Sequence, residues 1–211
     1  FTEVIPATHV TKHALTKDLG LKLNNEFIIT PPVHKWNTSK EKGWKYREKI
    51  GVAQDCNMFY NISVNNERKR LDQLLLYFRE HLLRKSCDKL VMHTQEFGGC
   101  DIVSVASRLG IKGNIRIIQD RSKEMIEGVM SAGGTYVGMP AAEGFGLPFW
   151  ESALLGKKLI HSDVGEIGYI AKDISGAEME IVEAKHPYFY PIGNQVWYSI
   201  GAMPKSKIYG K

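Results

Sequence analysis

Residues 139–151 have the sequence MPAAEGFGLPFWE, the pattern of a buried strand that ends in a tight turn and continues as a helix. Gly144 and Gly146 let the turn bend sharply and allow its backbone to approach a ligand closely. Pro148 falls in the first turn of the expected helix, where its missing N–H is tolerated. The unpaired N–H groups at the start of such a helix face an anion with a favourable dipole. This stretch therefore predicts a cradle for a pyrophosphate group.

Two carboxylates flank this turn. Glu143 immediately precedes it, and Glu151 lies one turn into the expected helix. A carboxylate that accepts hydrogen bonds from two adjacent hydroxyls is the usual way in which an α/β site holds a ribose. The pattern therefore indicates a nucleotide site rather than a purely structural turn.

Outside this stretch, apolar runs alternate with amphipathic runs along most of the chain. Near-continuous apolar strands separated by helices are typical of a parallel sheet that is covered on both faces. The pattern predicts an α/β fold, a Rossmann-like doubly wound parallel sheet, in which ligands bind outside the carboxyl ends of the strands. Strands are expected at residues 58–62, 89–93, 115–118, 136–139 and 158–161, and helices at residues 71–83, 101–109, 122–131 and 147–155.

The two ends of the chain depart from this alternation. Residues 8–18 predict a helix, and residues 26–30 (EFIIT) predict a short strand that two prolines stop. The lysine-rich residues 36–54 are expected to be irregular or weakly helical. We therefore expect a Rossmann-like domain over residues 1–175, followed by an extended tail or packing arm over residues 176–211.

Glu143 and Glu151 are separated by seven residues, and the segment EGFGLPFWE that they bound resembles the E-x7-E motif of the group 1 family of retaining GT-B glycosyltransferases. The resemblance extends more diffusely over residues 4–170 and covers the C-terminal, nucleotide-sugar-binding half of the GT-B fold. It implies that Glu143 is a catalytic residue that contacts the donor sugar and that Glu151 binds the ribose hydroxyls. It also implies a backbone lining for the sugar and diphosphate from Gly144, Phe145, Gly146 and Leu147.

Residues 61–72 (NISVNNERKRLD) are similar to the strand, loop and helix that carry an arginine and a lysine for the donor diphosphate in this family. Lys69 matches that lysine, which makes it a second catalytic candidate. The arginine position falls on Val64, so the family pattern is broken there. Arg68 and Arg70 are the alternative sources of the missing charge in the donor-binding site.

The composition of the 211-residue chain is that of a soluble globular protein, with 43% hydrophobic and 24% charged residues. No apolar run approaches the roughly 18 residues of a membrane span. The net charge of +5 suits a partner that carries phosphates, which leaves a nucleotide diphosphate, a nucleic acid and an anionic membrane surface open.

Three cysteines and two histidines could also serve as metal ligands or reactive groups. Cys56, Cys87 and Cys100 form no CxxC pair and are expected to be reduced, largely buried thiols of a cytoplasmic protein. His9 and His13 have a spacing that can bind zinc. Because no third ligand lies nearby in the sequence, they are interpreted as surface histidines, and no metal site is expected.

These patterns together predict a glycosyltransferase donor domain that binds a nucleotide diphosphate sugar and uses no cofactor beyond that donor. A family member also has an N-terminal acceptor-binding domain, which the sequence from Phe1 onward does not contain. The chain is therefore expected to be a fragment of a longer enzyme or half of a two-subunit enzyme, and to transfer little sugar alone. The alternative is a non-catalytic nucleotide-sugar-binding or assembly module.

Nucleic-acid binding rests on basicity alone and is not favoured, whereas the basic early segment is compatible with peripheral membrane contact.

Overall fold

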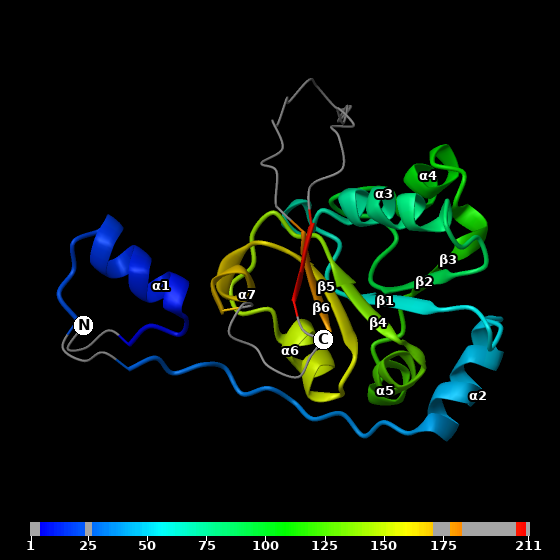
Figure 1. Ribbon diagram of the computed structural model, residues 1–211, viewed down its shortest axis with the longest axis horizontal. Helices are drawn as coiled ribbons and strands as arrows, with labels where there is room; N and C mark the ends of the chain where they lie inside the picture. The colour runs from blue at the N-terminus through cyan, green and yellow to red at the C-terminus, as the bar shows by residue number, and fades with distance from the viewer. Residues whose placement is uncertain (1–4, 24–26, 171–177, 183–205, 210–211) are drawn as a thin grey trace.

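Seven strands form one sheet in the computed structural model, which describes residues 5–23, 27–170, 178–182 and 206–209. The strand order is β3-β2-β1-β4-β5-β6-β7 (Figure 1). The first six strands in sequence are parallel, and β7 runs antiparallel to β6. The strands are β1 (Met58–Ile62), β2 (Lys89–His93), β3 (Ile115–Ile118), β4 (Thr135–Gly138), β5 (Lys158–Ser162), β6 (Met179–Val182) and β7 (Ser206–Tyr209).

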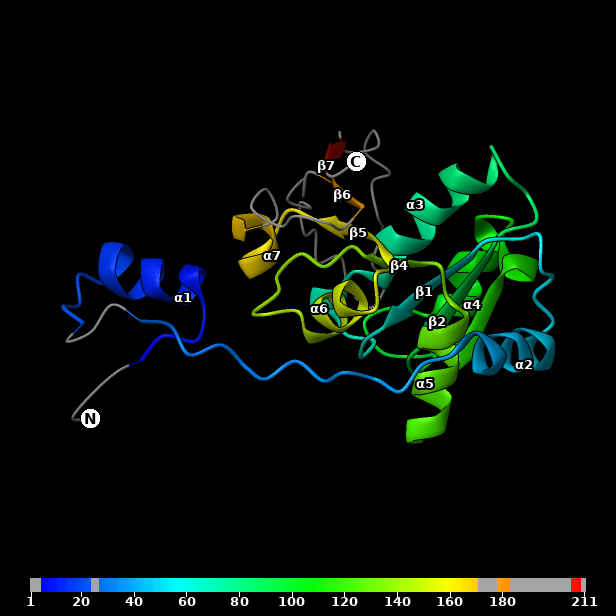
Figure 2. The same cartoon turned by 60° about the horizontal axis from the view of Figure 1, so that its bottom comes forward.

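Helices cover both faces of this sheet (Figures 1 and 2). α3 and α4 pack on one face, while α5 and α6 pack on the other, where α2 lies against α5. The helices are α1 (His9–His13), α2 (Lys40–Ile50), α3 (Leu71–Leu82), α4 (Ile102–Arg108), α5 (Lys123–Ala132), α6 (Leu147–Leu154) and α7 (Gly165–Ile170), and a π-helical turn, Ala14–Asp18, continues α1.

The central strands are buried on both sides, which explains their near-continuous apolar sequences. In β1, Met58 and Tyr60 belong to the hydrophobic cluster that includes residues of α5 and α6. Phe59, between them, belongs to the opposite cluster with residues of α3 and α4. Successive side chains of a strand point to opposite faces, so both faces need apolar residues. The predicted Rossmann-like doubly wound sheet is confirmed, and β1, β2 and β3 have the predicted bounds.

The segment expected to be irregular or weakly helical contains the regular helix α2. Ser39 begins it, since its hydroxyl accepts a hydrogen bond from the backbone N–H of Lys42 at 3.1 Å, and Gly51 ends it in the left-handed conformation. Gly43 lets α2 approach α5, because a Cβ there would lie 2.8 Å from the Ser131 carbonyl oxygen. The helix is therefore stabilised by packing on α5, which its lysine-rich composition does not reveal.

The predicted strand at residues 26–30 is wrong for the part that the structure describes. Residues 27–30 belong to an extended segment that runs from the region of α1 to α2 and pairs with no described strand (Figure 2). Phe27 and Ile29 are more than half exposed, so this apolar pattern does not mark a core strand. Residues 24–26 lie outside the described residues.

Two pieces of the predicted tail extend the sheet. β6 pairs with β5, and β7 pairs with β6. Residues 176–177, 183–205 and 210–211 lie outside the described residues, as does the expected domain boundary at residue 175, so the division into a domain and a tail stays a prediction. None of the helices in the described ranges is both long and apolar enough to cross a lipid bilayer.

Candidate functional site

The candidate site lies where the strand order of the sheet reverses. β1 has β2 on one side and β4 on the other, so the crossovers from β1 and β4 leave the sheet in opposite directions. Ligands of open α/β sheets bind outside the carboxyl ends of the strands at such a switch point. The loop after β1 and the turn after β4 meet there, and the Ala141 N–H donates a hydrogen bond of 2.9 Å to the Arg68 carbonyl.

Lys69 and Glu143 are brought together by this meeting of loops. The Lys69 ammonium forms an ion pair with Oε2 of Glu143. Arg68 lies beside them, with Nη1 at 3.4 Å from Oε1 of Glu143 and at 2.7 Å from the Ala142 carbonyl oxygen. The side chains of Glu143 and Lys69 are only 10% and 16% exposed, so this pair is largely shielded from solvent.

The Glu143 carboxyl group is held in its ionised form by its neighbours. Burial acts to raise its pKa, but the hydrogen bond and charge of Lys69 and the charge of Arg68 outweigh burial, and the pKa falls below its ordinary value. The site thus contains a permanent carboxylate and two cations at neutral pH. Such a cluster can bind an anion through its cations and hydroxyls through its carboxylate.

The turn between β4 and α6 is packed tightly against the start of α7. Gly146 has φ +80° and precedes α6, and a Cβ there would lie 2.6 Å from Cδ1 of Ile167. Gly165 has φ +61°, and a Cβ there would lie 1.8 Å from the Glu143 carbonyl oxygen. The Glu166 N–H donates a 3.2 Å hydrogen bond to the Gly144 carbonyl. Two glycine turns therefore fix the backbone that carries Glu143.

The first turn of α6 faces this cluster without a side-chain cap. Pro148 stands at its start, as predicted, and no side chain in the described ranges caps the Gly146 end. Pro148 has no N–H, and the Phe149 N–H donates to the Gly146 carbonyl at 2.9 Å. The Leu147 N–H is therefore the group of this first turn that is left for an anion. Gly144 and Leu147 are exposed at this turn, while the indole N–H of Trp150 bonds the Phe145 carbonyl at 2.7 Å.

Glu151 lies on α6, partly buried, next to a residue that anchors the helix to the sheet. That residue is Ser152, whose hydroxyl is 2.8 Å from the Tyr60 hydroxyl of β1. Within the described part of the chain, no group donates a hydrogen bond to the Glu151 carboxylate or forms an ion pair with it. Its oxygens therefore keep their full capacity to accept hydrogen bonds.

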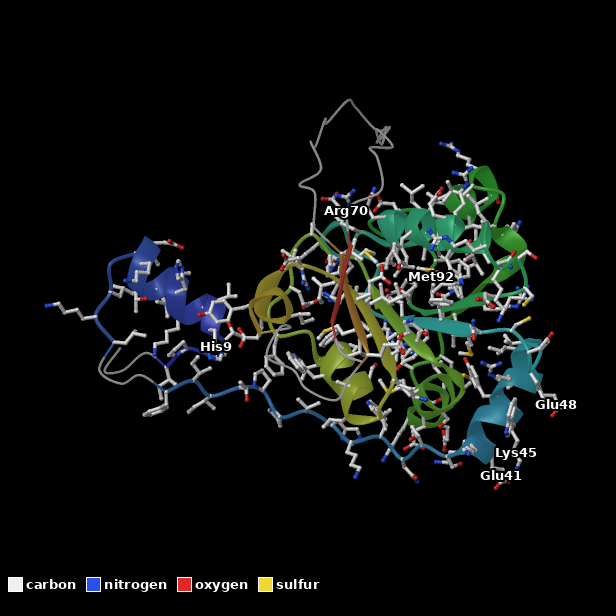
Figure 3. All side chains as sticks on the ribbon, in the orientation of Figure 1. His9, Glu41, Lys45, Glu48, Arg70 and Met92 are labelled. Carbon is white, nitrogen blue, oxygen red and sulfur yellow. The ribbon has the colours of Figure 1, made fainter. Side chains whose placement is uncertain are left out.

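The two alternative arginines occupy different environments. Arg68 contacts Glu143, whereas the guanidinium of Arg70 is buried against the Asp72 carboxylate at 3.2 Å. Arg70 lies at the start of α3 with φ +47°, a left-handed conformation that it shares with no other described non-glycine residue (Figure 3). Val64, at the position expected to carry an arginine, is 56% exposed.

His161 is a site residue that the sequence reasoning missed. It is the next-to-last residue of β5, is buried, and hydrogen-bonds through Nδ1 to the Ser162 carbonyl oxygen at 2.8 Å. Desolvation lowers its pKa to about 4, with Glu143 and Lys69 among the charges that act on it, so the imidazole is neutral at pH 7. Gly138 makes room for the ring, since a Cβ there would lie 2.8 Å from Cδ2 of His161. Its place at the carboxyl end of a predicted strand, where ligands of such sheets bind, could have identified it as a site residue.

His9 has a structural partner. Its backbone N–H and Nδ1 contact the Glu166 carboxylate at 2.8 and 2.6 Å, which joins α1 to α7, whereas His13 is exposed (Figure 3). Among the described residues, no three His, Cys, Asp or Glu side chains lie close enough together to hold a metal ion.

No family model and no curated protein sequence matches this chain. Solved structures, in contrast, match the chain. WaaG, a glycosyltransferase involved in lipopolysaccharide biosynthesis, superposes with a TM-score of 0.70 and 16% identity over 86% of this chain and 49% of its own. HepE of Anabaena, solved with UDP and glucose, gives a TM-score of 0.67 and 20% identity over 80% of this chain and 46% of its own.

The C-terminal domain of LpcC, a glycosyl transferase group 1 family protein from Francisella tularensis, gives a TM-score of 0.55 and 16% identity over 71% of this chain and 78% of its own. The chain thus spans about half the length of WaaG and of HepE. These likenesses show that it has the fold of one Rossmann-like half of a GT-B glycosyltransferase.

Proposed function

We propose that this chain is the donor-binding half of a retaining glycosyltransferase and binds a nucleotide diphosphate sugar at the switch point of its sheet. The observation that carries this proposal is the meeting of Lys69 and Glu143 beside the start of α6. Cations, a carboxylate and a free N–H at a helix start suit a diphosphate that is joined to a sugar. The complexes of HepE with UDP and with UDP-glucose support this class of ligand.

Departure of the nucleotide diphosphate is the step that the site is built to assist. Negative charge develops on the leaving phosphate as the bond to the sugar breaks. Lys69, Arg68 and the Leu147 N–H at the start of α6 stabilise that charge, and Glu143 orients the sugar hydroxyls. Because Lys69 already contacts Glu143, donor binding requires the ammonium to be shared with a phosphate or moved onto it.

Glu151 is the proposed anchor for the ribose. It stands on α6, one turn beyond the proposed diphosphate cradle, with both carboxylate oxygens available. A ribose presents two adjacent hydroxyl donors, which match one carboxylate. This assignment separates two roles, with the sugar held by Glu143 and the nucleoside by Glu151.

The acceptor is proposed to bind to a second domain. The matched full-length glycosyltransferases are about twice as long as the part this chain aligns with, which supports a partner half in the same chain or in another subunit. The isolated chain should then bind nucleotide and transfer little sugar. We propose no cofactor beyond the donor, so a chelator should leave nucleotide binding unchanged.

One observation favours a second candidate, a module that binds the nucleotide sugar without transferring it. The exposed Val64 stands where the resembling family carries a phosphate-binding arginine, and Arg70 is occupied by Asp72. A site with fewer cations stabilises a leaving diphosphate less. Transfer by this chain after addition of an acceptor domain would exclude the module.

The proposed function is tested by calorimetric titration of the full chain with UDP, GDP and ADP, followed by the matching nucleotide sugar. Saturable binding of one nucleotide, with the other two at least about ten-fold weaker, supports a donor site and identifies the base. Binding of none of them contradicts the proposed function. Steeply salt-dependent binding of DNA or RNA without nucleotide binding would point to the disfavoured nucleic-acid role.

A further inference from the structure

Two cysteines lie side by side at the end of the sheet opposite to the candidate site. β1 and β2 are parallel neighbours, and Met58 pairs with Lys89 in their register. This first pair is made in part by the Lys89 N–H, which donates to the Asn57 carbonyl, next to Cys56, at 3.0 Å. Counting back two positions from Met58 and from Lys89 gives Cys56 and Cys87. Both cysteines lie in the turns just before their strands, and the register, extended over these two residues, brings them next to each other.

The geometry of neighbouring strands matches that of a disulfide. Adjacent strands lie about 4.8 Å apart, and the Cα atoms of bridged cysteines are usually about 4.4–6.8 Å apart. The Cys87 thiol is the main cause that raises the pKa of the Cys56 thiol, so the two side chains are neighbours, and both are free thiols in this structure.

The backbone on both sides of this pair is held in place. The Cys56 thiol lies 3.7 Å from Oδ1 of Asp55, and the Cys87 thiol lies 3.7 Å from Oδ1 of Asp88. The Arg47 guanidinium donates to the Cys56 carbonyl at 3.0 Å. The Asp88 carboxylate also accepts the backbone N–H that follows Cys56, at 2.9 Å. The backbone that carries the two cysteines is therefore fixed.

We propose that Cys56 and Cys87 form a disulfide when the protein meets a low-molecular-weight disulfide oxidant. The thiolate of Cys87, the more exposed of the two, attacks the oxidant, forms a mixed disulfide and releases one small thiol. The thiolate of Cys56 then attacks the Cys87 sulfur and releases the second. Two protein thiols lose two electrons and two protons in all, and the oxidant is reduced to two thiols.

Closure of this bond is slow at neutral pH. In the reduced protein the interaction with Cys87, burial and the charges of Cys87 and Asp55 raise the pKa of Cys56 to about 11. Burial and Asp55 still raise the pKa of Cys56 once Cys87 is part of the mixed disulfide. Only a small fraction of this thiol is therefore ionised at pH 7, and the thiolate is the attacking species. The pair behaves as a slowly formed structural bond and not as a rapid exchange catalyst.

Cys100 provides an internal control. It follows β2, so it lies beyond the carboxyl end of the sheet, where its N–H bonds the Asn65 side chain at 3.2 Å. The five residues of β2 alone span roughly 16 Å. Cys100 is therefore out of disulfide range of Cys56 and Cys87.

The experiment is oxidation of the full-length chain with oxidised glutathione, alkylation of remaining thiols, and mass mapping of peptides without reduction. The expected product links Cys56 to Cys87 and leaves Cys100 outside any internal bond. Cys100→Ser should give the same link, and Cys87→Ser should give none.

The oxidised protein should melt about 5–10 °C higher, because the bond closes a loop of about 30 residues in the unfolded chain. Glutathione adducts without an internal link, or a link through Cys100, would overturn the proposal. Neither result depends on nucleotide binding.

Discussion

Glu143 and Lys69, which are 74 residues apart in the sequence, form an ion pair across the switch point of the sheet. Each comes from a different crossover: Lys69 precedes α3 and Glu143 precedes α6. The two side chains that were expected to bind separate parts of one donor are therefore in direct contact with each other. This contact has a direct consequence for the order of affinities among variants.

Glu143→Gln should bind the nucleoside diphosphate about three- to ten-fold more tightly than the native chain. The change removes the charge that competes with phosphate for Lys69 and Arg68 while keeping the size of the side chain. Calorimetry with the preferred nucleotide measures it, and the corresponding nucleoside, which lacks phosphate, should show no change. Weaker binding of the diphosphate by Glu143→Gln would mean that the carboxylate assists phosphate binding.

Glu151→Ala should weaken nucleotide binding about ten-fold or more, because a hydrogen bond to a charged group contributes roughly 1.5–3 kcal/mol. Its carboxylate has no donor within the described residues, so its removal leaves no protein group unpaired and folding should be preserved. Glu48→Ala, an exposed change on α2, is the matched control (Figure 3). Equal affinities for the two variants would remove Glu151 from the site.

Stability should fall with acid between about pH 6.5 and 4 because of His161. Its pKa is about 4 in the folded chain and 6.5 in the unfolded chain, so the unfolded state takes up a proton first. The stabilisation is complete above pH 6.5 and is lost as pH falls, with about 2 kcal/mol lost between pH 7 and 5. Urea unfolding of the native chain and of His161→Gln at both pH values measures this difference. His13→Gln, at an exposed position, should keep the native slope.

Gly165→Ala should destabilise the protein much more than Gly156→Ala. Both glycines have positive φ, +61° and +64°, so both substitutions carry a backbone cost of about 1 kcal/mol. A Cβ at Gly156 meets nothing within 4 Å, whereas one at Gly165 overlaps the Glu143 carbonyl oxygen. The expected loss in the free energy of unfolding is about 3 kcal/mol for Gly165→Ala. Equal unfolding midpoints would show that the turn after β4 can move away from α7 without cost.

The sheet was predictable because its signals are local. Apolar runs mark β1 to β5, and the sequence of residues 139–151 contains its own strand end, glycine turn and helix start. The strand predicted at residues 26–30 failed for residues 27–30 because an apolar run alone does not supply a partner strand. α2 was underestimated because its stability comes from close packing on α5, a contact between segments far apart in the sequence.

Apart from His161, the residues of the candidate site were named from the sequence, but the contacts between them were not. No pattern indicated that Lys69 contacts Glu143, since that contact depends on the strand order. The choice between Arg68 and Arg70 was open because both flank the same lysine. In the structure Arg68 contacts Glu143 and Arg70 contacts Asp72. Arg70 has the left-handed backbone conformation, which sequence periodicity does not reveal.

Glu166 makes the N-terminal helix an integral part of the domain and not a loose tether. Its carboxylate is about 1% exposed and accepts hydrogen bonds from the His9 N–H and imidazole and, at 3.4 Å, from the Val10 N–H. If α1 swung away, this buried charge would lose those donors together, a desolvation cost of several kcal/mol. The N–H of the same residue holds the Gly144 carbonyl. A movement of α1 would therefore act through Glu166 on the turn that carries Glu143.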